Sequence, residues 1–231
     1  MHQQSQSATG EDVVALQRVY RLLSRLWLHG GDEELISELR APSMFEAFAG
    51  AGGVLPAELN VRTQDELAAE YCRLFVGPSG HLPLYQSVWQ AGRYQGPAVG
   101  SMERVIEIAR YRCSEQTDGV MVDHLGVQLE VADHLLGLMS MSKDETDLLM
   151  ATRELFSTFF GAHLLWPLGM LEIAAHRTTS RFYRAIIQMT RNFLLSESRC
   201  WQVFEQTTGF ATDGRSDSLD ESTAPLVQIQ D

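Results

Sequence analysis

The segment "DHLGVQLEVADHLL", residues 123–136, decides the fold class of this 231-residue chain. An α-helix turns by about 100° per residue, so Leu125, Leu129 and Leu136 fall in one apolar stripe. Neighbouring apolar residues widen that stripe to about half of the helix circumference. A helix with this pattern is packed on both flanks. The segment therefore predicts the central helix of a helical bundle, over about residues 118–141.

Two polar side chains interrupt the apolar arc of this helix. His124 and Gln128 lie one turn apart within it, whereas Asp123 and Glu130 fall on the polar side of the helical wheel. Polar groups at packed positions need hydrogen-bond partners. Periodicity alone leaves two interpretations open. The two residues bond a neighbouring loop and only stabilise the fold, or they support a functional surface.

The rest of the chain also favours helices, because strand signals are almost absent and helical periodicity recurs. We expect an all-α, single-domain helical bundle over residues 10–205, with a flexible N-terminus (1–9) and a mobile, polar tail (206–231). Thr9 with Asp12 is expected to cap the first helix, and a glycine-rich break is expected at 50–53. Further helices are expected at 32–39, from Pro42, at 63–75, 101–113, 118–141, 144–160, 162–177, 180–195 and 198–204.

Residues 77–100, "GPSGHLPLYQSVWQAGRYQGPAVG", differ in composition from the helical segments. Three prolines and five glycines disfavour a continuous helix, and the segment is longer than an ordinary connector. It nevertheless carries Leu82, Leu84, Tyr85 and Trp89, which a disordered linker would lack. We therefore expect a long ordered loop that packs near the start of the 118–141 helix.

Composition limits the classes of function. The hydrophobic fraction is 45% and no apolar run reaches the roughly 18 residues of a membrane span, which indicates a soluble protein without stable membrane insertion. A net charge of −12 argues against nucleic-acid binding and is compatible with simple solubility or with a cationic partner. Three widely spaced cysteines and no visible secretory signal predict no disulfide and a cytoplasmic location.

No catalytic or ligand-binding motif is present in the sequence. There is no P-loop, no GxGxxG and no HExxH, and the histidines and cysteines lack the spacing of a zinc site. We therefore predict no metal, no cofactor and no catalytic residue. A small all-helical enzyme that uses Asp123 and His124 remains an alternative.

Three motifs in order resemble the TorD/DmsD/NarJ family of molybdoenzyme maturation chaperones. They are "EYCRLFVGP" at 70–78, "PLYQSVW" at 83–89 and "DHLGVQLEVADHLL" at 123–136, and the similarity extends over about residues 16–195. The resemblance implies a cytoplasmic chaperone that binds the twin-arginine signal peptide, or the apo form, of a molybdopterin oxidoreductase until its cofactor is inserted. Leu84 and Gln128 depart from the family pattern, which commonly has proline and glutamate there.

The resemblance also implies which residues bind the peptide. Such a peptide pairs an apolar stretch with two arginines, so its receptor needs apolar surface and carboxylates. Helical spacing by itself equally favours core positions for Tyr71, Leu74 and Phe75. The expected peptide-binding residues are Tyr71, Leu74, Phe75, Pro83, Tyr85, Ser87, Trp89, Asp123 and Glu130, with His124 and Gln128 bracing the loop and Glu70 as a further candidate charge.

Two further questions stay open from the sequence. A NarJ-like assembly factor would bind its catalytic subunit without an Arg-Arg signal. The chain can also be a monomer or a dimer that exchanges helices through the 77–100 hinge.

Overall fold

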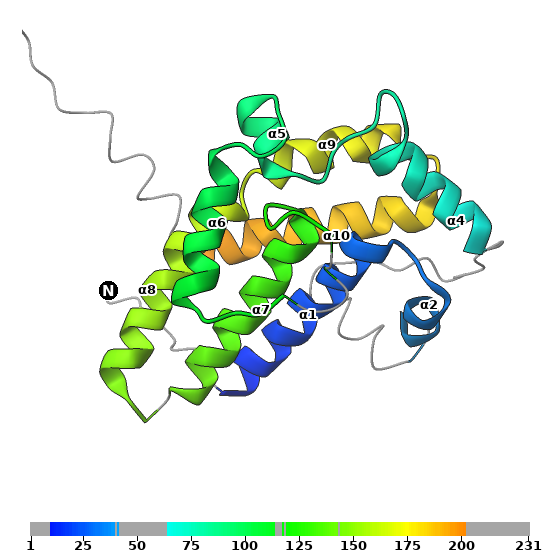
Figure 1. The fold of residues 1–231 in the computed structure, drawn as a ribbon. Coiled ribbons are helices and arrows are strands. Elements are labelled where there is room, and N and C mark those ends of the chain that lie inside the picture. The colour runs from blue at the N-terminus through cyan, green and yellow to red at the C-terminus, as the bar shows by residue number, and fades with distance from the viewer. Residues whose placement is uncertain are drawn as a thin grey trace, which may run out of the picture.

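Every regular element of the described chain is helical, which confirms the all-α, single-domain prediction (Figure 1). The computed structural model describes residues 10–39, 41, 64–113, 117, 119–142 and 144–201. The elements are α1 (Gly10–His29), α2 (Glu33–Leu39), α4 (Gln64–Tyr71), a π-helical turn (Cys72–Val76), α5 (Gln86–Ala91), α6 (Pro97–Ile108), α7 (Leu125–Met141), α8 (Thr146–His163), α9 (Pro167–Arg177) and α10 (Arg181–Cys200).

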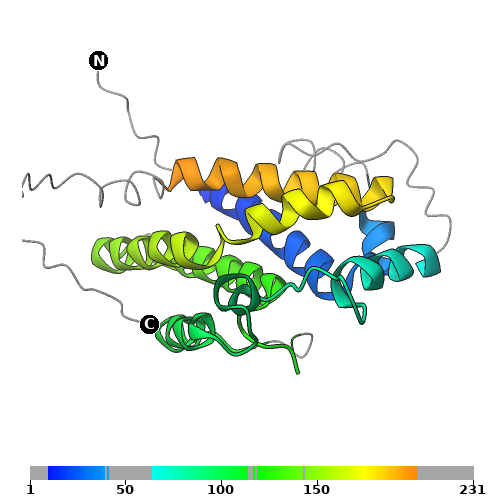
Figure 2. The same cartoon turned by 90° about the horizontal axis from the view of Figure 1, so that it is seen from above.

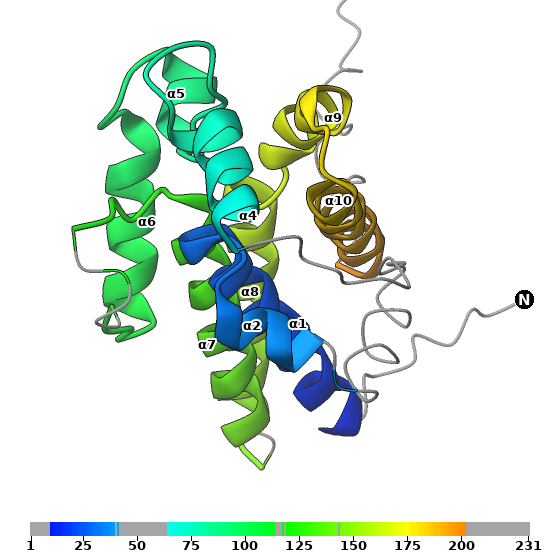
Figure 3. The same cartoon turned by 90° about the vertical axis from the view of Figure 1, so that its right-hand side faces the viewer.

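Helix α7 lies at the centre of the bundle, as its sequence pattern predicts. Leu125, Val127, Leu129, Val131 and Leu135 have no exposed surface, so the helix is covered on all sides along its first turns. Figures 2 and 3 show α9 and α10 on one side of the molecule and α6 on the other, with α1, α7 and α8 between them. Burial on both flanks explains why this helix combines high apolar content with a few inward polar side chains.

Gly126 allows α1 and α7 to cross closely. A Cβ atom on Gly126 would lie 2.5 Å from Cγ of Leu28, which is closer than real contacts allow. At the same crossing, the Ser24 hydroxyl donates to the Gly126 carbonyl oxygen at 2.9 Å. The first turn of α7 is therefore fixed against α1 both by shape and by a buried hydrogen bond.

The 77–100 segment is ordered and packed against the start of α7, as predicted. The Gln86 N–H donates to the Asp123 carbonyl oxygen at 3.0 Å, and the Leu125 N–H donates to the Leu84 carbonyl oxygen at 2.8 Å. The expectation of a plain loop is wrong, because the segment contains α5 and the first turn of α6. Gly92 ends α5 in a left-handed conformation (φ 67°), and Pro97 opens α6.

Several predicted helix boundaries need correction. The expected 118–141 helix begins only at Leu125, because His124 is extended and caps it. The expected 162–177 helix begins at Pro167, and the 180–195 helix continues to Cys200, so no break precedes Ser198. The predictions for Thr9, for Pro42, for the 50–53 break, for the start of a helix at residue 63, for residues 202–204 and for both termini lie outside the described residues.

Candidate functional site

Asp123 does not lie on an exposed helical face, contrary to the wheel prediction. The helix begins after it, and Asp123 has no exposed surface. Its Oδ2 atom accepts a hydrogen bond from the Ser87 N–H at 2.9 Å. Asp123 therefore anchors the start of α5, and its other oxygen, Oδ1, is buried without a hydrogen-bond partner. The wheel failed because it extended the helix through residues that form a turn.

His124 caps α7. Its Nδ1 atom accepts from the Gly126 N–H at 3.1 Å, so the neutral ring carries its proton on Nε2. Burial, with a smaller contribution from His29, lowers the pKa of His124 to about 4. Tyr85 pairs with His124 in an isolated antiparallel bridge, and the two rings meet edge to face with centroids 5.0 Å apart. These contacts join the 77–100 segment to the start of α7.

Gln128 belongs to a buried polar network that joins four helices and the loop before α9. Its Nε2 donates to Oε1 of Gln86 at 2.6 Å, and its Oε1 accepts from Nε1 of Trp166 at 2.8 Å. Gln128 has no exposed surface. Both halves of its side-chain amide are therefore used inside the protein, in agreement with the stabilising interpretation of this position.

His163 completes this network from the end of α8. Its Nδ1 lies 2.8 Å from Oε1 of Gln86, and its Nε2 lies 3.0 Å from the Ser101 hydroxyl. The Gln86 oxygen can only accept, so Nδ1 donates and Nε2 accepts. Burial lowers the pKa of His163 to about 4, although the charge of Asp123 acts in the opposite direction. The Gln86 amide nitrogen donates to the Ala162 carbonyl oxygen at 2.7 Å.

Gln86, His163 and Trp166 were not singled out from the sequence. Gln86 lies inside the "PLYQSVW" motif, and His163 and Trp166 lie in "GAHLLWP". The sequence does not show that folding brings these residues into one hydrogen-bond network. Gln86 lies 42 positions before Gln128 and 77 positions before His163, which are two of its hydrogen-bond partners. A polar residue within an apolar stretch was the one signal available.

Partly exposed aromatic rings gather on the outer side of the α5 segment. Tyr85 stacks edge to face on Tyr94 at 5.4 Å, and Tyr94 is 49% exposed. Trp89 lies one turn after Tyr85, is half-buried, and donates from Nε1 to the Pro83 carbonyl oxygen at 2.7 Å. We call Pro83, Tyr85, Trp89 and Tyr94 the aromatic surface. Tyr94 was missing from the predicted set, because its distance from the other rings was not visible in the sequence.

Other predicted binding residues face the core. Leu74 and Phe75 are buried at 2% and 4% exposure, and Phe75 packs edge to face on Trp27. The Tyr71 hydroxyl donates to the Trp27 carbonyl oxygen at 2.7 Å. Ser87 has no exposed surface. In this conformation Leu74, Phe75 and Ser87 offer a partner almost no surface.

Two of the predicted charges lie away from the aromatic surface. Glu70 forms an ion pair with Arg73 at 2.8 Å and accepts from the Thr179 N–H, and these contacts lower its pKa to about 2. Glu130 lines a pocket of about 300 Å³ between α1 and α7, together with Arg21, Asp133 and Met141. The charge of Glu70 is therefore compensated by Arg73 within the protein, whereas Glu130 lines a pocket.

Within the described residues, no three histidine, cysteine, aspartate or glutamate side chains are grouped to hold a metal ion. Cys72, Cys113 and Cys200 are exposed and free. In the same part of the chain, no helix alone has the length and apolar character of a membrane span. Helices α8 and α9 reach both criteria only as a pair that is bent by 47°.

Comparison with known families identifies the chain through its central part. The family model described as nitrate reductase delta subunit matches residues 34–166, which include the α5 segment and all of α7. A search of curated proteins found no match. The matched range holds the aromatic surface, Asp123, Gln128 and Glu130, and it covers more than half of the chain. The chain therefore belongs to the nitrate reductase delta subunit family, a family of molybdoenzyme assembly chaperones.

Proposed function

We propose that this protein is a cytoplasmic maturation chaperone that binds the catalytic subunit of a molybdopterin-dependent oxidoreductase. It holds the apo form of that subunit, through an apolar segment at or near its N-terminus, until the cofactor is inserted. In this proposal the client segment lies on the aromatic surface. The twin-arginine signal peptide is the favoured segment, and a client without that signal is the alternative.

One observation carries the proposal: the α5 segment has a rigid inner side and an apolar outer side. On the inner side Gln86 and Ser87 are fixed by Gln128, His163 and Asp123. On the outer side the rings of Tyr85, Trp89 and Tyr94 remain partly exposed. Aromatic rings that are fixed before binding lose little conformational entropy on contact with a partner, which makes them efficient binding groups.

The geometry at Asp123 and His124 favours binding over catalysis. Oδ2 of Asp123 is used by the Ser87 N–H, and Nδ1 of His124 is used by the Gly126 N–H. Exposure is 0% for Asp123 and 7% for His124, so a substrate would have almost no access to either. Each of the two side chains accepts a hydrogen bond from a backbone N–H group of the protein itself.

Co-purification from the native host tests the proposal. The full-length chain with an affinity tag should retain a molybdoenzyme catalytic subunit that lacks its cofactor. Tyr94→Ala should reduce the retained amount about fivefold or more, because it removes exposed apolar contact without opening the core. Ile173→Ala is the matched control, since Ile173 is also partly exposed but lies on α9.

Client variants separate the two forms of the proposal. A client whose two signal arginines are replaced by glutamine should be retained less if the signal peptide is read, and equally if another segment is bound. Capture of no molybdoenzyme, or equal capture by the wild type and Tyr94→Ala, would show that the aromatic surface does not bind the client.

A further inference from the structure

Four arginines form a charged stripe along the outer side of α10. An α-helix turns by about 100° per residue, so the four fall within an arc of about 80°. No acidic residue shares that arc, because the one carboxylate of α10, Glu197, is 5% exposed and accepts from Nε1 of Trp201. Three of the arginines are exposed and the third in order is half-buried. We call the stripe the arginine face, and it consists of Arg181, Arg184, Arg191 and Arg199.

The charges of the arginine face are not compensated within the described residues. None of the ion pairs found there involves an arginine of α10. Arg184 donates to the Thr178 carbonyl oxygen at 3.0 Å, which is an uncharged acceptor. Like charges on one helix face repel one another unless an anion lies nearby. In a chain whose net charge is −12, this face favours an acidic partner.

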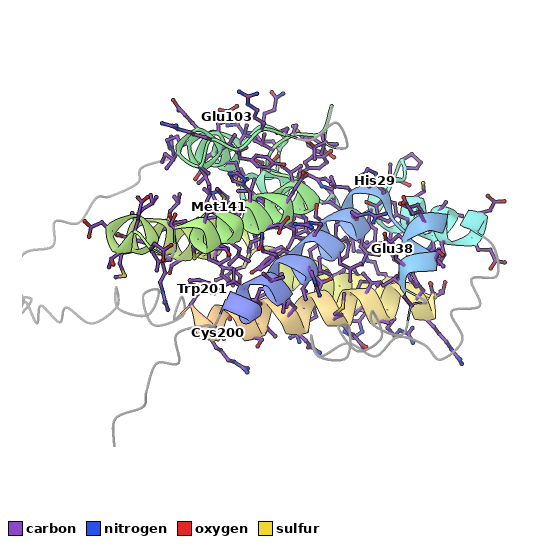
Figure 4. The ribbon with its side chains drawn as sticks, turned by 90° about the horizontal axis from the view of Figure 1, so that it is seen from below. His29, Glu38, Glu103, Met141, Cys200 and Trp201 are labelled. Atoms are coloured by element: carbon purple, nitrogen blue, oxygen red, sulfur yellow. The ribbon has the colours of Figure 1, made fainter. Side chains whose placement is uncertain are left out.

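The chain leaves the bundle at one end of the arginine face, after an anchored tryptophan. Figure 4 shows Cys200 and Trp201 at the end of α10. The Trp201 ring packs on the Phe156 ring with centroids 4.4 Å apart, and the Arg153 guanidinium carbon lies 5.6 Å from the Trp201 centroid. Residues 202–231, which lie outside the described residues, therefore follow a residue that the bundle holds in place beside the arginine face.

The sequence that follows Trp201 has the opposite charge. Residues 202–231 contain six carboxylate side chains and one arginine, and four of the carboxylates lie within "DGRSDSLDE", residues 213–221. An extended chain rises about 3.4 Å per residue, so this segment can span about 27 Å. Arg181 and Arg199 are separated by about 27 Å along the helix axis. The acidic segment thus matches the arginine face in charge and in length, and residues 202–212 suffice for the turn between them.

We infer that the acidic segment 213–221 of this chain folds back onto the arginine face of α10 and shields it from other acidic polypeptides. A single contact between exposed charges is weak. A short tether to the end of the same helix, however, gives an effective concentration of about millimolar, so several weak contacts together suffice. The inference does not rest on the proposed function, because it concerns α10 and not the aromatic surface.

Paramagnetic nuclear magnetic resonance of the full-length, ¹⁵N-labelled protein tests this contact. A nitroxide is attached to Ser218→Cys after the three native cysteines are replaced by serine. The label should lower the intensities of the Arg184 and Gln188 amide signals at least about twofold relative to the reduced label. The Glu107 signal should not change, because α6 lies on the opposite side of the molecule from α10 (Figure 3). About 0.5 M sodium chloride should remove most of the effect.

Charge variants show which groups make the contact. Neutralising three charges of the arginine face should abolish the broadening, whereas neutralising three exposed arginines outside α10 should not, although both variants change the net charge equally. The α10 variant is Arg181→Gln, Arg191→Gln, Arg199→Gln, and the matched control is Arg93→Gln, Arg104→Gln, Arg112→Gln. Exchanging the signs should restore the broadening. That variant is Arg181→Glu, Arg191→Glu, Arg199→Glu with Asp213→Arg, Asp217→Arg, Asp220→Arg.

Binding of fluorescent poly-L-glutamate to the full-length protein tests the shielding. A variant with a neutral segment should bind this acidic polypeptide at least about fivefold more tightly than the wild type, because the segment no longer competes for the arginine face. The substitutions are Asp213→Asn, Asp217→Asn, Asp220→Asn and Glu221→Gln.

Equal broadening of the α10 and α6 signals, or broadening that persists in the α10 variant, would overturn the inference. Equal affinity of the wild type and the neutral-segment variant for poly-L-glutamate would also overturn it, because the face would then be open to other acidic polypeptides. Each of these results would leave the proposed function standing, since client capture through the aromatic surface is measured separately.

Discussion

Helix α7 carries two polar clusters that differ in one respect: whether their hydrogen bonds are complete. Around Gln128, the nitrogen and the oxygen of its side-chain amide each have a partner, Gln86 and Trp166, and Gln128 has no exposed surface. Around Glu130, the pocket is open and Oε2 has no partner. A polar residue in an apolar helix is structural where its hydrogen bonds are complete within the protein. It is a candidate binding group where they are not.

The largest effect should come from disrupting the cluster of Gln128, Gln86, His163 and Trp166, which we call the closed cluster. Gln128→Leu removes two buried hydrogen bonds and leaves Nε1 of Trp166 without its acceptor, so we expect a loss of about 3 kcal/mol in the free energy of unfolding. That corresponds to a melting temperature lower by about 6–12 °C. Gln188→Leu is the control, since Gln188 is an exposed glutamine on α10. Equal melting temperatures of the two variants would contradict a structural role for Gln128.

Asp123 should stabilise the fold through the one carboxylate oxygen, Oδ2, that accepts a hydrogen bond. Asp123→Ala leaves the Ser87 N–H buried without an acceptor and should cost about 2–3 kcal/mol in urea unfolding. Asp123→Asn keeps an acceptor oxygen and should cost about 1 kcal/mol. A variant pair with wild-type stability and weaker client binding would restore the exposed, peptide-facing role that the sequence predicted for Asp123.

The closed cluster should also be sensitive to acid through His163. The pKa of His163 is lowered from 6.5 to about 4, so between these values the unfolded chain binds a proton that the native ring does not. Stability contributed by neutral His163 is therefore complete above pH 6.5 and is lost as the pH falls toward 4. Between about pH 6.5 and 4.5 the wild type should lose about 2 kcal/mol more than His163→Gln does.

Chemical unfolding at several pH values measures this difference. His176→Gln is the control, because His176 is exposed in the last turn of α9. Burial raises the pKa of Glu197, which changes stability in the opposite direction, but both variants retain Glu197. Parallel pH curves for the wild type and His163→Gln would show that His163 does not couple the network to pH.

The smallest effect should come from a substitution at Glu130, whose surroundings we call the open cluster. Glu130→Gln removes no hydrogen bond of Oε2, so the free energy of unfolding should change by less than about 0.5 kcal/mol. Thermal melts of Glu130→Gln and Gln128→Leu, two positions apart on α7, compare the clusters directly. A loss of about 2 kcal/mol or more in Glu130→Gln would show that Glu130 supports the fold, as Gln128 does.

The amino-acid sequence was sufficient to predict the helical class, the central place of α7 and the packing of the 77–100 segment against it. These features follow from periodicity and apolar content, which are local properties of the chain. The sequence also carried the family resemblance, whose broad form the match to residues 34–166 confirms. The client-binding roles of Pro83, Tyr85, Trp89 and the other residues of the predicted set stay predictions.

The contacts of the polar residues in and before this helix are visible only in the folded structure. Asp123 and Glu130 fall on the same polar side of the helical wheel. In the structure Asp123 accepts a hydrogen bond from the Ser87 N–H, whereas Glu130 lines a pocket. Gln128 finds its partners in Gln86 and Trp166, which lie 42 positions before and 38 positions after it. Whether a polar side chain finds hydrogen-bond partners depends on groups that folding brings together from distant parts of the chain. Helical periodicity is a local property and does not predict those contacts.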